Sequence, residues 1–233
     1  MNTSIIVQAR MGSTRFPGKV LAHINGLTAL ECLVNQIKFC KSVDNVIVAT
    51  TTLNEDNLIA ELCNKLEVEL FRGDPVDVLD RYYQCAKTYS VDNIVRLTAD
   101  NPLIDPSLVD QVVNFYQKNS YDYVSNCEIR TYPYGSEVEI FSCKALEKSW
   151  KEAKREDERE HVTIFLKSNK EIFQTFCIHN QKNISHYRWT VDTKNDLELV
   201  KEIYKRIDHF PILLSDILNV LEKEPDLLKI NQN

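Results

Sequence analysis

The chain has 233 residues, of which 43% are hydrophobic and 27% charged, a composition typical of a globular protein with a substantial core. Its formal net charge of −6 argues against a general nucleic-acid binder, because phosphate backbones favour a basic protein face. No apolar run approaches the roughly 20 residues that span a bilayer, and the N-terminus lacks the basic region of a signal peptide, so we expect no membrane partner.

Seven cysteines are scattered along the chain, and no two lie closer than eight positions. No CxxC pair occurs, so the cysteines indicate neither a zinc site nor a redox motif. They are expected to be reduced thiols packed inside a cytoplasmic protein.

Strand and helix patterns alternate through the first half of the chain. Apolar runs predict buried strands at residues 4–9, 45–50, 68–71 and 93–98, and longer periodic runs predict helices at residues 29–41, 55–66, 76–89 and 106–118. Thr28 and Glu31 have the spacing of a capping box, and Asn54 is expected to cap the helix after it. This alternation predicts an α/β fold, with a mostly parallel mixed sheet covered by helices on both faces.

The pattern changes beyond about residue 121. Strands are expected at residues 121–125, 138–141, 173–178 and 186–191, helices at residues 143–153 and 158–167, and two further helices close the chain. The charged run at residues 151–160 is expected to be a solvated helical face. We expect a single domain over residues 1–233, in which residues 121–180 form a small insertion, an acceptor-binding or dimerisation lobe.

The loop after the first predicted strand, RMGSTRFPGK (residues 10–19), carries two glycines and three cations. Glycines let backbone N–H groups approach phosphate oxygens, and Arg10, Arg15 and Lys19 offset the phosphate charge. Ligands of α/β folds bind at the carboxyl ends of strands, where this loop lies. The pattern favours a polyphosphate site, and the alternative is an exposed basic turn.

Two familiar phosphate-binding motifs do not fit this loop. A P-loop has four residues between its glycines and Ser or Thr after its lysine, whereas five residues separate Gly12 from Gly18, and Val20 follows Lys19. The GxGxxG fingerprint of dinucleotide-binding proteins is also absent.

Two aspartates follow predicted strands. Asp100 comes just after the strand at residues 93–98, and Asp192 comes directly after the strand at residues 186–191. Carboxylates at this edge of a sheet are suited to hold a hard cation, and Mg²⁺ typically takes only one or two of them. The alternative for each aspartate is a helix N-cap.

Five blocks of the chain, in matching order between about residues 4 and 200, resemble the spore-coat polysaccharide cytidylyltransferase family, which is related to the CMP-sialic acid and CMP-ketodeoxyoctonate synthetases. The blocks are IIVQARMGSTRFPGKVL (5–21), FRGD with DVLDR (71–74 and 77–81), RLTADNPLID (96–105), REHVT (159–163) and RWTVD (188–192).

The resemblance implies a Rossmann-like nucleotidyltransferase fold, CTP as donor, Mg²⁺ as cofactor, and a homodimer formed partly by the middle lobe. It implies that Arg10, Arg15 and Lys19 hold the triphosphate and act with Asp100 in catalysis, and that the metal lies on Asp100 and Asp192. The residues expected to bind the nucleotide are Ala9, Arg10, Gly12, Ser13, Thr14, Thr51, Arg72, Asp77, Arg81, Thr98 and Ala99.

Some of these assignments have simpler alternatives. Thr51 ends a predicted strand, where β-branched residues are common for reasons of packing. Asp77 lies in the first turn of a predicted helix and complements its dipole, and Arg81 is spaced to pair with Asp77 at i, i+4.

The acceptor is expected to be a small anionic sugar-like molecule, with a 2-keto-3-deoxy sugar acid as the first choice. A lone histidine is more often a surface or hydrogen-bonded residue, and only the matching REHVT block favours a binding role for His161. The residues expected on the acceptor side are Asn101, Tyr134, Glu137, Glu139, Glu160 and His161.

The expected reaction is attack of an acceptor oxygen on the α-phosphorus of CTP with release of pyrophosphate, and the sequence identifies no dedicated general base. A phosphorylated small acceptor, giving a CDP-linked product, is the alternative within this chemistry. A nucleotide-sugar-dependent glycosyltransferase is disfavoured because Asp100-Asn101-Pro102 stands where a DxD motif is usual. A nucleotide-binding module without catalysis is the remaining alternative.

Overall fold

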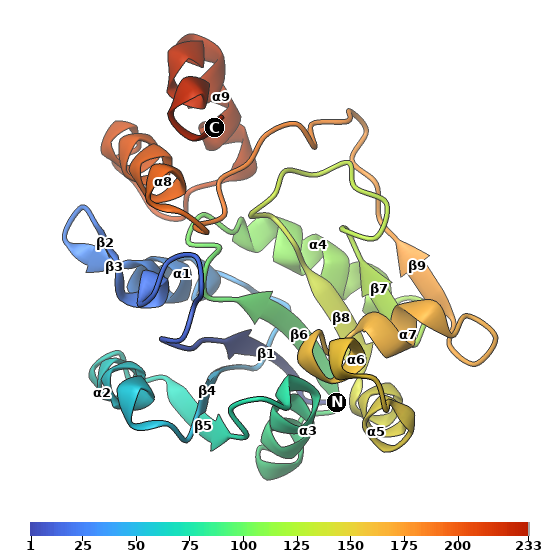
Figure 1. The fold of residues 1–233 in the computed structure, drawn as a ribbon. Coiled ribbons are helices and arrows are strands. Elements are labelled where there is room, and N and C mark those ends of the chain that lie inside the picture. Colours follow the sequence, from blue (N-terminus) through green and yellow to red (C-terminus); the bar gives the residue numbers. More distant parts are fainter. Residues whose placement is uncertain (233) are drawn as a thin grey trace.

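The computed structural model describes residues 1–232, and its centre is a seven-stranded sheet in the order β5-β4-β1-β6-β8-β7-β9 (Figure 1). Strand β8 is antiparallel to both of its neighbours, and the other strand pairs are parallel. The predicted mostly parallel mixed sheet is therefore confirmed. The strands are β1 (Thr3–Gln8), β4 (Asn45–Thr51), β5 (Glu69–Gly73), β6 (Asn93–Thr98), β7 (Tyr123–Ser125), β8 (Glu139–Ser142) and β9 (Thr175–Cys177).

Helices cover both faces of this sheet. Successive side chains of a strand point to opposite faces, so Ile5 and Val7 of β1 pack in one cluster and Ile6 packs in the other. The first cluster includes helices α1 (Ala29–Ile37), α2 (Asn57–Lys65) and α4 (Pro106–Gln117). The second includes α3 (Val78–Thr88), α5 (Cys143–Glu152) and α7 (Ile164–Ser168). Burial of both faces explains why the strands read as nearly continuous apolar runs.

A third apolar cluster surrounds Trp189 and belongs to the end of the chain. It joins α8 (Lys194–Arg206), α9 (Leu214–Lys223) and a 3₁₀ helix (Pro225–Asn231) to α1 and to the hairpin of β2 (His23–Ile24) and β3 (Leu27–Thr28). In Figure 1 helix α8 lies beside this blue hairpin, and the red helix α9 lies beyond α8. Within residues 1–232, no helix has the length and apolar character needed to cross a membrane.

The ends of several helices follow the expected local chemistry. The Thr28 side chain accepts a hydrogen bond from the N–H of Glu31, whose carboxylate accepts one from the N–H of Thr28, which confirms the capping box. The prediction for Asn54 was wrong, because Asn54–Asp56 form a short 3₁₀ helix and α2 begins at Asn57.

Two predictions in the second half of the chain were wrong. A single helix over residues 158–167 does not form; α6 (Glu156–Glu160) and α7 are separated by a turn at Val162, whose φ is +48°. Since α5 ends at Glu152 and Glu158 is buried, residues 151–160 are not one solvated helical face.

The predicted strand at residues 186–191 does not form within the described chain. An isolated bridge between Arg188 and Tyr134 instead connects this segment to the rest of the fold. The three strands within residues 121–180, β7, β8 and β9, extend the main sheet.

Candidate active site

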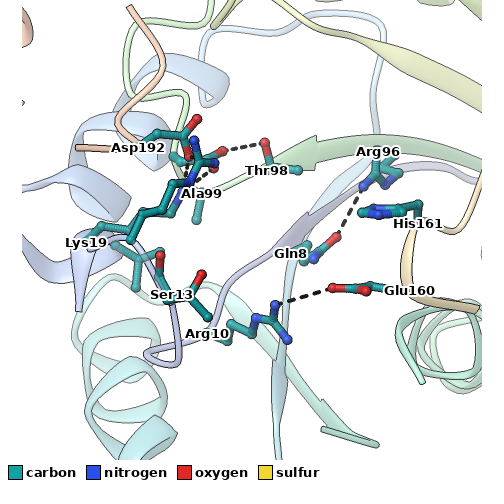
Figure 2. A pocket seen from close by; sticks show the side chains of 14 residues that line it. Gln8, Arg10, Ser13, Lys19, Arg96, Thr98, Ala99, Glu160, His161 and Asp192 are labelled. Atoms are coloured by element: carbon teal, nitrogen blue, oxygen red, sulfur yellow. Dashed lines mark hydrogen bonds and ion pairs between the residues drawn. The ribbon is translucent and has the colours of Figure 1, made fainter. Parts of the chain in front are cut away.

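A pocket of about 290 Å³ opens above the carboxyl ends of β1 and β6 (Figure 2). These strands lie where the strand order reverses, since the chain passes from β1 to β4 and β5 on one side and returns to β6 on the other. This is the position at which α/β sheets bind ligands. The residues that line the pocket are Gln8, Arg10, Ser13, Thr14, Arg15, Lys19, Val20, Arg96, Thr98, Ala99, Asp100, Glu160, His161 and Asp192.

The loop that leaves β1 folds back on its own backbone. The carbonyl oxygen of Met11 accepts hydrogen bonds from the N–H groups of Ser13 and Gly18, both at 2.9 Å. Gly18 has a φ of 72°, in the left-handed region that glycine adopts without strain. A 3₁₀ turn (Lys19–Leu21) follows directly, so this closed loop sets the position from which Lys19 enters the pocket.

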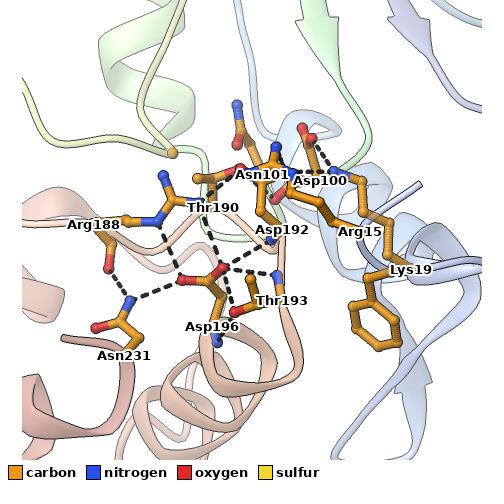
Figure 3. Close-up of polar contacts among 12 residues, drawn as sticks. Arg15, Lys19, Asp100, Asn101, Arg188, Thr190, Asp192, Thr193, Asp196 and Asn231 are labelled. Atoms are coloured by element: carbon orange, nitrogen blue, oxygen red, sulfur yellow. Dashed lines mark hydrogen bonds and ion pairs between the residues drawn. The ribbon is translucent and has the colours of Figure 1, made fainter. Parts of the chain in front are cut away.

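Lys19 lies between the two predicted metal-binding aspartates (Figure 3). Its Nζ atom is 2.6 Å from Oδ2 of Asp100 and 2.8 Å from Oδ1 of Asp192. Burial alone lowers the pKa of Lys19, but the two carboxylates outweigh that effect and raise the pKa above its ordinary value. The lysine is therefore charged and holds both carboxylates at one point.

Two arginines add to the positive charge around Asp192. Arg15 Nη2 is 2.9 Å from its Oδ1, and Arg188 Nη2 is 2.7 Å from its Oδ2. Arg188 also contacts Asp196 on the first turn of α8, through Nε at 3.2 Å. Burial favours the neutral form of Asp192, yet Lys19 and the arginines prevail, so its pKa is lowered and it remains ionised.

Neither Asp100 nor Asp192 caps a helix, so the simpler alternative for both residues is wrong. Helix α4 is capped by Asp105 and α8 by Thr193. Oδ1 of Asp100 accepts a hydrogen bond from the Thr98 hydroxyl at 2.6 Å. The N–H of Val191 donates to the Asp100 carbonyl at 2.7 Å, so a main-chain hydrogen bond, rather than the predicted strand, brings the two aspartates together.

The two aspartates offer the hard oxygen donors that Mg²⁺ prefers. Within residues 1–232, no group of three or more His, Cys, Asp or Glu side chains is arranged to hold a metal ion. Both carboxylates nevertheless converge on one cationic atom, Nζ of Lys19. The residues present therefore fit an ion that takes two protein carboxylates and completes its coordination with other oxygens.

The opposite side of the pocket is formed by Gln8, Arg96, Glu160 and His161 (Figure 2). Glu160 ends helix α6 and approaches Arg10, with 3.8 Å between its Oε1 and Nη2. Both side chains of that pair are largely exposed, so its energetic contribution is small.

The pocket brings together eleven of the predicted site residues and leaves ten outside its lining. Those in the lining are Arg10, Ser13, Thr14, Arg15, Lys19, Thr98, Ala99, Asp100, Glu160, His161 and Asp192. Those outside it are Ala9, Gly12, Thr51, Arg72, Asp77, Arg81, Asn101, Tyr134, Glu137 and Glu139.

Two of the residues predicted to bind the nucleotide, Arg72 and Arg81, have partners within the protein. The Arg72 guanidinium donates to the carbonyls of Thr51 and Leu53, both at 2.9 Å. Arg81 is fully buried and donates to the Asp74 carbonyl. The predicted pair of Arg81 with Asp77 was wrong.

Asp77 instead caps α3 and forms an ion pair with Arg159 of α6, whose Nε lies 2.9 Å away. This pair links helix α6 to helix α3, beside the pocket.

Several residues predicted on the acceptor side lie in a polar group next to the pocket. Asn101 donates to Glu137 at 3.2 Å, and Arg130 pairs with Glu137 at 2.6 Å. The Arg130 guanidinium carbon lies 3.6 Å from the ring centre of Tyr134. Glu139 is only 3% exposed and lies beneath the pocket rather than in its lining.

Sequence reasoning did not assign individual roles to Gln8, Arg96 or Arg188. Arg96 carried a usable signal, because an arginine inside an otherwise apolar strand, NIVRLT, requires a partner or a ligand. Gln8 had no comparable signal, since its contact is with Arg96, far away in the sequence. Arg188 pairs with Asp192 only four residues later, a contact that the strand predicted over residues 186–191 did not suggest.

A cationic loop and two convergent aspartates, placed at the switch point of this sheet, define a nucleotidyltransferase-type protein. The chain belongs to the cytidylyltransferase family, whose model matches residues 4–225. It is therefore a CTP-dependent nucleotidyltransferase.

Several known proteins are similar to this chain. It is 42% identical over 230 residues to an uncharacterised protein of Methanocaldococcus jannaschii, covering 98% of this chain and 93% of that one. It is 32% identical over 231 residues to the spore coat polysaccharide biosynthesis protein SpsF of Bacillus subtilis, covering 95% and 94%. An 8-amino-3,8-dideoxy-manno-octulosonate cytidylyltransferase of Shewanella pealeana is 28% identical over 127 residues, about half of each chain (53% and 51%).

Solved structures support the same assignment. A cytidylyltransferase from Leptospira borgpetersenii has a TM-score of 0.96 and 37% identity, and the match covers 100% of this chain and 98% of that one. A CMP:2-keto-3-deoxy-manno-octonic acid synthetase complexed with CTP has a TM-score of 0.67 at 16% identity, covering 88% and 99%, and shows a shared fold. The resemblance and the fold expected from the sequence are confirmed.

Proposed function

We propose that the protein transfers CMP from CTP to an acidic sugar, a nonulosonic or ketodeoxy sugar acid, and releases pyrophosphate. The observation that carries this proposal is the meeting of Arg15 and Lys19 with the carboxylates of Asp100 and Asp192 at one end of the pocket. The name of the SpsF relative suggests that the product serves surface polysaccharide or glycan synthesis.

Arg10, Arg15 and Lys19 would bind the triphosphate of CTP. All three line the pocket, and phosphate oxygens would compete with the aspartates for Arg15 and Lys19. The loop also offers backbone donors, because the N–H groups of Gly12 and Thr14 donate to no main-chain carbonyl within residues 1–232. Such N–H groups in a loop after a strand are suited to phosphate oxygens.

Asp100 and Asp192 would hold Mg²⁺, which supplies charge neutralisation and alignment of phosphate oxygens when bound. The neighbours of the aspartates orient them for this role. The Thr98 hydroxyl donates to Asp100, and Arg188 donates to the Asp192 oxygen that does not contact Lys19. Partners of this kind keep ligating carboxylates in a fixed orientation.

The proposed chemistry is an in-line displacement. An acceptor oxygen forms a bond to the α-phosphorus as the bond from that phosphorus to the leaving pyrophosphate breaks. Positioning and charge neutralisation supply most of the acceleration in phosphoryl transfer. Arg10, Arg15 and Lys19 would stabilise the negative charge that grows on the pyrophosphate.

A sugar acid is the favoured acceptor because relatives that share this fold are named for such substrates. A phosphorylated small acceptor, giving a CDP-linked product, is the second candidate, since the cations of the pocket suit either anion. Membership of the cytidylyltransferase family leaves the glycosyltransferase and non-catalytic alternatives without support.

We also propose that the chain is a single domain that forms a homodimer through residues 121–180. Phe176 lies on the edge strand β9 and stacks on Phe115 with 4.7 Å between ring centres, yet it remains 37% exposed. Ile129 and Ile172 in the same segment are 61% and 39% exposed. A second copy would cover such side chains.

All seven cysteines are free, as expected of a cytoplasmic protein.

Pyrophosphate release tests the proposal directly. The protein is mixed with CTP and Mg²⁺ and with a panel of 2-keto-3-deoxy sugar acids, nonulosonic acids and sugar phosphates. We expect release that requires a sugar acid and stops when EDTA removes the metal. Release with sugar phosphates alone would replace the proposed acceptor, and release with no acceptor of the panel would refute the proposal.

A further inference from the structure

Arg96 is a cation whose side chain is 16% exposed, on the side of the pocket away from Lys19 (Figure 2). It lies in β6 among apolar residues, and its partner in the register of the neighbouring antiparallel strand is Glu139 of β8. Arg96 Nη1 contacts Oε2 of Glu139. A buried ion of either sign requires a partner, and this cross-strand pair provides one for both residues.

Glu139 is fixed by four groups. Its Oε1 accepts hydrogen bonds from the Tyr123 hydroxyl at 2.6 Å, the Thr163 hydroxyl at 2.8 Å and Lys167 Nζ at 3.1 Å, and Arg96 takes the other oxygen. Burial favours the neutral carboxyl, but Arg96 and Lys167 outweigh it, so the pKa of Glu139 lies far below its ordinary value. This carboxylate has no free oxygen to offer a substrate, so its function is to hold Arg96.

The guanidinium of Arg96 keeps donors that no protein group uses. Of its five N–H bonds, one on Nη1 is donated to Glu139, and one on Nη2 makes a long contact of 3.3 Å with the Gln8 amide oxygen. The Nε atom is buried and has no partner within the described residues. Buried polar atoms without partners are uncommon and indicate a missing ligand or water.

The charges of this group do not cancel. Arg96 and Lys167 contribute two positive charges and Glu139 one negative charge, and Glu160 on the same side of the pocket is paired with Arg10, which leaves one positive charge next to the pocket. A carboxylate carries one negative charge and matches the planar fork of a guanidinium, whereas a phosphate monoester carries nearly two. The balance favours a carboxylate ligand.

A strained turn joins this group to the pocket surface. Val162 has a φ of +48°, which is rare for a β-branched residue, and the N–H of Thr163 donates to the carbonyl of His161 across it. The turn lets His161 line the pocket while Thr163 contacts Glu139. Backbone strain of this kind is concentrated at functional sites.

We infer that Arg96 binds the carboxylate of the acceptor, with Gln8 and His161 beside it, and that Glu139 positions Arg96 for this contact. The inference rests on the proposed acceptor class and deepens it, since it separates an acceptor carboxylate site from the triphosphate site at Arg10, Arg15 and Lys19. Arg96 thereby determines specificity for sugar acids over their neutral analogues.

The test measures binding before turnover. The probes are 2-keto-3-deoxy-manno-octonic acid and its methyl ester, which lacks the negative charge, and their binding is followed by ligand-observed NMR without nucleotide. The main variant is Arg96→Lys, which keeps the charge but loses the planar fork. Because that variant risks misfolding, a second one, Arg96→Gln with Glu139→Gln, removes both buried charges at once. The control, Arg206→Lys, alters an arginine of α8 that is paired with Glu202 on the same helix and with Glu224, the residue directly after α9.

We expect the wild type and the control to bind the acid, and Arg96→Lys to bind it about tenfold more weakly because it loses one of two parallel hydrogen bonds. Arg96→Gln with Glu139→Gln should bind it at least about 30-fold more weakly, because the acid then loses its charged partner. The preference for acid over ester should shrink in Arg96→Lys and disappear in the double variant. In turnover assays the KM for the acceptor should rise while the KM for CTP stays within about twofold and thermal unfolding shows a folded protein.

Acid binding that is unchanged in a folded Arg96 variant, or a rise in the KM for CTP instead, overturns the inference while leaving the proposed reaction intact. Failure of the wild type to bind the acid overturns it as well. If the acid binds through Arg96 but no CMP is transferred, the inference stands and the proposed reaction fails.

Discussion

Replacing Lys19 with alanine should weaken both stability and catalysis, and Mg²⁺ should restore only the stability. Nζ of Lys19 makes two charge-assisted hydrogen bonds, at 2.6 Å to Asp100 and 2.8 Å to Asp192. Lys19→Ala removes both and leaves the two carboxylates facing each other. We expect a loss of about 3 kcal/mol in unfolding free energy, which lowers the Tm of a chain of this length by roughly 6–12 °C.

Mg²⁺ bound by Asp100 and Asp192 would replace the lost positive charge. In the wild type the ion competes with the lysine ammonium, so we expect Mg²⁺ to raise the Tm of Lys19→Ala by more than it raises the wild-type Tm. Turnover should stay lower by a factor of about 10²–10³, because a cation that stabilises the leaving pyrophosphate is gone.

Calorimetry with Mg²⁺ or EDTA, together with pyrophosphate release, measures both effects. Lys151→Ala is the matched control, since its pair with Glu147 is exposed and its loss should leave the Tm nearly unchanged. The reasoning would be refuted if Mg²⁺ raised the Tm of the wild type and of Lys19→Ala by the same amount, or if that variant kept the wild-type kcat/KM.

Three further predictions follow from named contacts. Asp100→Asn should fold but lose metal-dependent turnover, and wild-type turnover would rule out its assignment. Glu139 faces Arg96, Lys167, Tyr123 and Thr163, and its pKa is depressed in the folded protein. As the pH falls, Glu139 is therefore protonated in the unfolded chain before it is protonated in the folded protein. The stability that ionised Glu139 contributes is full above its ordinary pKa of 4.5 and is lost as the pH falls below that value. The Tm should therefore fall more steeply between pH 5 and pH 3 in the wild type than in Glu139→Gln. Parallel curves of Tm against pH would contradict this. Gly135→Ala places a Cβ 2.6 Å from Trp189 Cδ1 at a φ of +104°, and calorimetry should show a loss of about 2 kcal/mol or more; an unchanged Tm would show that the turn relaxes easily.

The strands of the sheet were predictable where the local sequence pattern agrees with the burial of the strand in the folded protein. Strand β6 (Asn93–Thr98) matches its predicted bounds, because it is buried on both faces and reads as an apolar run. The segment at residues 186–191 has β-branched and aromatic residues, but it meets the fold through a bridge at Arg188, a main-chain hydrogen bond from Val191 to Asp100 and a cluster around Trp189. Its extended shape is set by tertiary contacts, which composition does not reveal.

The site was predictable where residues follow one another along the chain. The loop with Arg10, Arg15 and Lys19 and the aspartate at 100 lie at strand ends, so their convergence follows from a parallel sheet. The break at Val162 was not predictable, because it depends on a left-handed conformation that a β-branched residue rarely adopts. The fixed position of Arg96 depends on Glu139, a partner supplied by strand register.

The central claim is CMP transfer at the end of the pocket where Lys19 meets Asp100 and Asp192. Incubation with Mg²⁺, a sugar acid and CTP radiolabelled at the α-phosphorus tests it most directly. We predict that the label moves to the sugar acid and that one pyrophosphate is released for each labelled product, with both lost in Asp100→Asn. Label that remains in CTP, or that appears as free CMP whether or not an acceptor is present, would contradict the account.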